Sequence, residues 1–65
     1  MREPERIYPF CNKLAKCWSK CTDLRFGQLM YNFFKWIEYE KRIDPFYVED
    51  SKMLNYLKEY MKDEE

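Results

Sequence analysis

The residues of this sequence best suited to nucleophilic or metal-binding chemistry are three cysteines, which lie close together in the chain. Cys11, Cys17 and Cys21 form a C-x5-C-x3-C pattern, in which each thiolate could act as a nucleophile or ligate zinc. A structural zinc site needs four ligands, and the sequence contains neither a fourth cysteine nor any histidine. Because all three positions fall on the apolar side of a predicted helix, we expect buried, reduced thiols without metal.

Acid–base catalysis lacks its commonest residue, because histidine is absent. Paired carboxylates occur at Glu49-Asp50 and at 63–65. Asp50 is more simply explained as the N-cap of a helix, assisted by Glu49 at the positive end of the helix dipole. There is no second acidic cluster and no glycine-rich phosphate loop, so we expect a protein that is not an enzyme and uses no cofactor.

Lysines form the third candidate set. Lys13, Lys16 and Lys20 lie on one face of the first predicted helix, where they could contact phosphates. The chain as a whole has zero net charge and no recognisable DNA-reading motif, which disfavours nucleic acid as a partner. The charge is unevenly distributed, with +3 over residues 1–22, +1 over residues 23–42 and −4 over residues 43–65. The two ends are therefore complementary, within one molecule or between copies.

The sequence is rich in aromatic residues, with two Trp, six Tyr and five Phe among 65 residues. A chain this short cannot bury all of them, and tyrosine is favoured at protein interfaces. We expect Tyr31, Tyr39 and Tyr56 to remain at the surface as partner contacts. Arg25 and Gln28 are further polar candidates, either for a partner or for tying the segment 43–49 to the second helix.

Helical periodicity indicates three helices, over about residues 8–20, 23–41 and 50–62. The first has an apolar stripe that consists of Phe10, Leu14, Cys17, Trp18 and Cys21. The second has a wider apolar face, formed by Phe26, Leu29, Met30, Phe33, Phe34, Trp36 and Ile37, and should be central. The third carries Met53, Leu54, Leu57, Tyr60 and Met61 at helical spacing. The fold class predicted for residues 1–65 is therefore a single all-α, three-helix domain.

Local signals set the breaks between these helices. Thr22 or Asp23 is a suitable N-cap for the second helix, and Gly27 suggests a close helix crossing near its start. Asp44-Pro45 should end that helix, because proline disfavours helical geometry in the preceding residue. The apolar residues that follow predict a short extended aromatic plug over residues 43–49, packed against the other helices.

These residues also support a family resemblance over about residues 7–60. Trp18, the run Thr22-Asp23-Leu24-Arg25-Phe26-Gly27-Gln28-Leu29 and the later Asp44-Pro45-Phe46-Tyr47-x-Glu49-Asp50 resemble a pattern in short bacterial and phage proteins. The family pattern has proline where this chain has Thr22. The resemblance implies a phage or prophage origin, but no activity, cofactor or catalytic residue is attached to the group.

Two functional hypotheses follow, both without catalysis. The first is a small protein-interaction module that self-associates as a homodimer or, in a phage setting, inhibits a host or defence enzyme. The dimer would cover the wide face of the second helix and pair the lysine stripe with the acidic third helix. The second is a nucleic-acid-binding accessory protein. The longest apolar run is too short to span a membrane, and no signal-peptide pattern precedes it, so we expect a cytoplasmic protein without a membrane partner.

Overall fold

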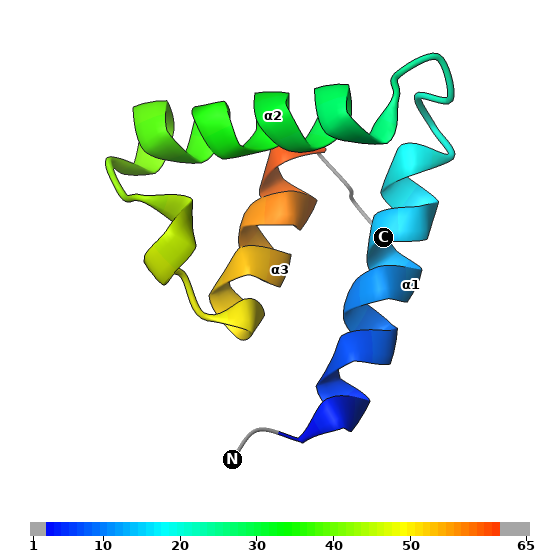
Figure 1. Ribbon diagram of the computed structural model, residues 1–65, viewed down its shortest axis with the longest axis horizontal. Helices are drawn as coiled ribbons and strands as arrows, with labels where there is room; N and C mark the ends of the chain where they lie inside the picture. Colours follow the sequence, from blue (N-terminus) through cyan, green and yellow to red (C-terminus); the bar gives the residue numbers. More distant parts are fainter. Residues whose placement is uncertain (1–2, 62–65) are drawn as a thin grey trace.

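Three α-helices form the fold of this protein, as the sequence predicted. The computed structural model describes residues 3–61, in which the α-helices are α1 (Ile7–Trp18), α2 (Phe26–Trp36) and α3 (Asp50–Tyr60). A 3-10 turn, η1 (Pro4–Arg6), leads into α1, and a π-helical turn, η2 (Ile37–Lys41), extends α2. A second 3-10 turn, η3 (Pro45–Tyr47), precedes α3. In Figure 1, α2 crosses the ends of α1 and α3, and α3 lies between α1 and η3.

The core is small and receives side chains from every long element. The buried residues among those described are Cys17, Leu29, Phe33, Ile37 and Leu57, each at most 1% exposed. Phe33 lies at the centre, with its ring 5.4 Å from that of Tyr60 and 6.3 Å from that of Trp36. The helical periodicity correctly predicted these inward faces, because residues three and four apart lie on one side of a helix.

The second helix begins three residues later than predicted. Neither Thr22 nor Asp23 is its N-cap, because Arg25 has the extended backbone of the cap residue. The Gln28 side-chain oxygen accepts a hydrogen bond from the Arg25 backbone N–H at 2.8 Å. The preceding loop is fixed by the Trp18 indole, which donates to the Leu24 carbonyl oxygen at 2.8 Å. This contact between side chain and loop is tertiary, which is why cap propensities alone misplaced the helix start.

Gly27 does not mark a close helix crossing. A methyl group at its Cα would find no neighbouring atom within 4 Å, so the predicted approach of a second backbone is wrong. The residue lies in the first turn of α2 on an exposed side. No packing reason for glycine is visible at this position.

The end of the second helix is marked by a change of backbone geometry. After Trp36 the chain makes the wider π-helical turn η2, and Arg42 then takes the left-handed conformation with φ 59°. A left-handed residue is a common helix terminator, although glycine usually occupies it. The helical structure therefore stops at Lys41, as the sequence predicted, and Asp44-Pro45 starts a new turn.

The predicted extended plug is wrong in both conformation and packing. Residues 45–47 form the 3-10 turn η3, capped by the Asp44 carboxylate, which accepts from the Phe46 N–H at 3.0 Å. Phe46 and Tyr47 are 84% and 75% exposed and contact each other edge to face. The local Asp-Pro cap turns both rings away from the helices. The apolar character of the two residues predicted burial and could not predict this direction.

The third helix is close to its prediction. Its N-cap is Glu49 rather than Asp50, which is the first helical residue. Its last residue is Tyr60, and Met61 is the C-cap. The predicted end at Lys62 and the acidic tail 63–65 lie outside the described residues.

Candidate interaction surface

The most conspicuous surface feature is the amount of exposed apolar side chain. Nine large apolar residues within 3–61 are at least 37% exposed, whereas five residues form the buried core. The exposed set consists of Ile7, Tyr8, Phe26, Tyr31, Phe34, Tyr39, Ile43, Phe46 and Tyr47. Single exposed apolar residues are ordinary, but several neighbouring ones mark a contact surface.

One such group runs along the outward side of α1. Ile7 and Tyr8 lie at its N-terminal end and are 46% and 70% exposed. Cys11 and Ala15 continue the group and are also exposed. At the C-terminal end the half-buried Trp18 ring lies 5.7 Å from the ring of Phe26, which is itself half exposed. The apolar surface therefore extends from the start of α1 to the start of α2.

The three tyrosines predicted as partner contacts differ in their exposure. Tyr31 and Tyr39 are exposed, on α2 and η2 respectively. Tyr56 was expected at the surface but is only half exposed, because its ring packs edge to face against Trp36 at 6.5 Å. It belongs to the shell around the core rather than to a partner surface.

One of the polar candidates has a structural role on α2. Gln28 caps its own helix, because its side-chain oxygen accepts the hydrogen bond of the Arg25 backbone N–H. The hypothesis that Arg25 and Gln28 tie the segment 43–49 to the second helix stays a prediction. Lys16 is exposed on α1 and Lys20 is exposed in the turn that follows this helix, whereas Lys13 is half-buried. Two of the three predicted lysines are therefore exposed.

The cysteines do not share one environment. Cys17 is buried in the core, and the partly buried Cys21 thiol lies 3.7 Å from the Cys17 carbonyl oxygen. Cys11 is exposed, so the prediction that all three are buried is wrong. Cys11 and Cys17 lie on opposite edges of the helical stripe. A stripe this wide extends past the core, so Cys11 stays exposed. Within residues 3–61 no three acidic, cysteine or histidine side chains are grouped closely enough to bind a metal.

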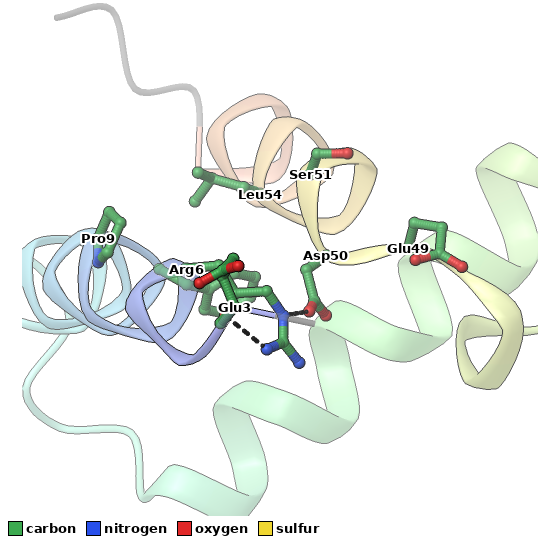
Figure 2. Close-up of a pocket in the computed structure, with 8 residues that line it drawn as sticks. Glu3, Arg6, Pro9, Glu49, Asp50, Ser51 and Leu54 are labelled. Carbon is green, nitrogen blue, oxygen red and sulfur yellow. Dashed lines mark hydrogen bonds and ion pairs between the residues drawn. The ribbon is translucent and has the colours of Figure 1, made fainter. Parts of the chain in front are cut away.

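An open groove lies between the first turns of α1 and α3. It encloses about 560 Å³ and is lined by Glu3, Arg6, Pro9, Phe10, Glu49, Asp50, Ser51 and Leu54. Figure 2 shows the Arg6 guanidinium directed at Asp50, with its Nε 2.6 Å from the carboxylate oxygen. A second guanidinium nitrogen donates to the Glu3 carbonyl oxygen at 3.0 Å. The ion pair is exposed and bridges two helices, which is a structural role.

A lysine–aromatic cluster joins η2 to α3. The Lys41 ammonium lies 5.4 Å from the Trp36 ring centre and 5.3 Å from that of Tyr56, and it pairs with Glu59 at 2.8 Å. The hydrogen bond to Glu59 raises the pKa of Lys41 above its usual 10.5, and partial desolvation opposes this. The cation fills the space between the two rings, so this cluster stabilises the fold and is not an open binding site.

Comparisons with known proteins identify no relative. No family model, no curated protein and no solved structure matches this chain. The resemblance to short bacterial and phage proteins stays a prediction. No helix among residues 3–61 has both the length and the apolar character needed to cross a membrane.

Neither the surface on α1 nor the exposed turn with Phe46 and Tyr47 was predicted from the sequence. A signal for the first was present, because Tyr8, Cys11, Ala15 and Trp18 recur at spacings of three and four residues. These positions adjoin the inward stripe and widen it beyond what one neighbouring helix would cover. The exposed turn had no comparable signal, because its exposure depends on its tertiary direction.

Proposed function

We propose that this protein is a small, non-enzymatic protein-interaction module that uses exposed aromatic side chains as its contacts. The observation that carries the proposal is that nine large apolar residues within 3–61 are exposed, whereas the buried core has five residues, one of which is a cysteine. Aromatic side chains supply large contact areas at low entropic cost, which is why they dominate interface energetics. Self-association is the simplest form of such an interaction, since it needs no other partner.

The distribution of the aromatics supports a contact role. Tyr8, Tyr39 and Phe46 lie on three different elements and are each at least 70% exposed. η3 is held by its own backbone and the Asp44 cap, so Phe46 is presented on a preformed turn. Preformed presentation lowers the ordering cost of binding.

Photo-crosslinking in the cells that naturally produce the chain tests this function. A benzophenone amino acid replaces Tyr8, Tyr39 or Phe46 in turn, and Asn55, which is exposed on α3, serves as the polar control site. We expect a discrete protein adduct, either a second copy or another protein, from at least one aromatic site and none from the control site.

The outcomes separate the candidate functions. An adduct with a host or defence enzyme would specify the inhibitor form of the proposal. Adducts with nucleic acid would contradict it in favour of the lysine-face hypothesis, and purified protein should then bind a short DNA duplex with an affinity that falls steeply with salt. Absence of any specific adduct at all three aromatic sites would refute the interaction function.

A further inference from the structure

The residues on the outward face of α1 are spaced like those of a helix–helix contact, but no helix among residues 3–61 covers this face. Tyr8, Cys11, Ala15 and Trp18 follow one another at steps of three, four and three residues. This alternation is the a/d spacing of a coiled-coil seam. All of them are exposed except Trp18, which is half-buried. The core side of α1 is formed by other residues, Leu14 and Cys17, which pack in the core.

Two copies of this seam fit each other in the antiparallel orientation. Its middle consists of the small residues Cys11 and Ala15, and its ends carry the large side chains of Tyr8 and Trp18. Small central residues let two helix backbones approach closely. A shallow hollow of about 310 Å³ is lined by Ala15, Trp18, Ser19 and Thr22. Ala15 and Trp18 lie on α1, whereas Ser19 and Thr22 follow its last residue, so this hollow lies where the helix ends and is open to a side chain from a facing helix.

Tyr8 is the matching side chain. In an antiparallel pair that places Tyr8 of one copy over this hollow of the other, Cys11 falls opposite the partner copy's position 15. The two-fold axis then passes near position 13, and the same contacts repeat on both sides of it, as an isologous interface requires. Phe26, half exposed beside Trp18, extends the apolar surface that receives Tyr8.

Charge on the flank of the seam selects the antiparallel direction. The exposed Glu5 precedes α1, and the exposed Lys16 lies in its last turn. Glu5 lies in the 3-10 turn η1 that leads into α1, so the two charges lie at opposite ends of the seam. An antiparallel pair brings the acidic start of each helix towards the basic end of the other, and it also opposes the two helix dipoles favourably. A parallel pair would place like charges together.

We propose that a second copy of this chain occupies the seam, forming a two-fold symmetric, antiparallel α1–α1 homodimer. The proposal rests on the proposed interaction function and names its first partner. The large side chains, the hollow and the charges of one copy each match features of a second copy. This favours a second copy over an unrelated protein as the partner. A contact along the twelve residues of α1 is about 18 Å long. It buries less surface area than the interface of a standard stable dimer, so we expect a dissociation constant of about 1–100 micromolar.

Substitution at the centre of the seam tests the dimer. Ala15→Arg places a charged side chain at an exposed helical position, so the monomer should fold normally. In the dimer, two guanidinium groups would lie near the axis, and because each substitution counts twice we expect affinity to fall by about 100-fold. Asn55→Arg makes the same charge change on the exposed side of α3 and should leave affinity unchanged.

Sedimentation equilibrium from about 1 to about 500 micromolar measures these affinities, with circular dichroism checking that each variant is helical. A monomeric wild-type chain over this range would overturn the proposal, whereas the crosslinking above would still test the interaction function separately. A dimer that Ala15→Arg leaves intact would overturn the α1 contact but retain self-association through another face.

A disulfide test fixes the direction of the helices. Ala15→Cys places a thiol opposite Cys11 of the other copy, and oxidised glutathione accepts the two electrons when the disulfide forms. We expect rapid covalent dimer formation by this variant and slower formation by Asn55→Cys, which has the same number of thiols. Preferential crosslinking of wild-type Cys11 to Cys11 of the other copy would contradict the pairing of position 11 with position 15 and overturn the proposed arrangement.

Discussion

Replacing Phe33 or Phe46 by leucine gives the sharpest test of which aromatics form the core. Phe33 is 1% exposed and contacts Trp36 and Tyr60, whereas Phe46 is 84% exposed and contacts only Tyr47 among the aromatic rings of residues 3–61. The two substitutions remove the same atoms from the same chain. Any difference in their effect on the free energy of unfolding therefore comes from the surroundings.

The expected magnitudes differ clearly. Truncating a buried Phe to Ala costs about 3–5 kcal/mol, and leucine retains about half of the lost side chain, so Phe33→Leu should cost about 1.5–2.5 kcal/mol. Phe46→Leu should change stability by less than about 0.5 kcal/mol. The whole domain is expected to be stable by only about 3–10 kcal/mol, so Phe33→Leu remains measurable where Phe33→Ala approaches complete unfolding.

Urea denaturation followed by far-ultraviolet circular dichroism measures both effects. With a slope of about 1 kcal/mol per molar urea, the midpoint should fall by about 1.5–2.5 M for Phe33→Leu and by less than about 0.5 M for Phe46→Leu. All proteins must be compared at one concentration, because a dimer makes stability depend on concentration. Equal losses for the two variants would refute the core described here and restore the packed aromatic segment that the sequence alone predicted.

Four further predictions concern single positions, each measured by urea denaturation. Gly27→Ala should stabilise the protein by about 0.5–1 kcal/mol, because a methyl group meets no neighbour there; destabilisation would reveal a close contact. Gln28→Met removes the acceptor for the Arg25 N–H and should cost about 0.5–1 kcal/mol, whereas Gln28→Glu keeps an acceptor and should cost nothing. Arg42→Gly should gain up to about 1 kcal/mol by relieving the left-handed backbone, while Arg42→Ala should gain nothing, and equal effects would contradict this explanation. The pKa of Lys41 is raised by its hydrogen bond to Glu59, so the contribution of the ammonium is complete below pH 10.5 and is lost as pH rises through the folded-state pKa. Lys41→Arg stays charged there, so its stability relative to wild type should increase above about pH 10.5, and a constant difference would argue against the contact.

The sequence by itself determined the fold class and most of the core. Phe33, Ile37 and Leu57 are buried as their helical spacing predicted, because an apolar stripe can be removed from water only by packing against another helix. Helix interiors were also predicted well, since the hydrogen bonds that form them are local. The tyrosines of the second helix illustrate the same point: Tyr31 and Tyr39 are exposed because they lie opposite its apolar face.

The tertiary structure decided the boundaries and the surface. The start of α2 depends on the Trp18 contact with Leu24, and the exposure of Phe46 depends on the direction in which a capped turn leaves the helix. Cys11 was predicted on the buried side because its residue type favours burial, yet the core ends before reaching it. Periodicity shows which residues share a face, but only the placement of neighbouring helices shows how much of that face they cover. The uncovered part, on α1, is where the proposed partner binds.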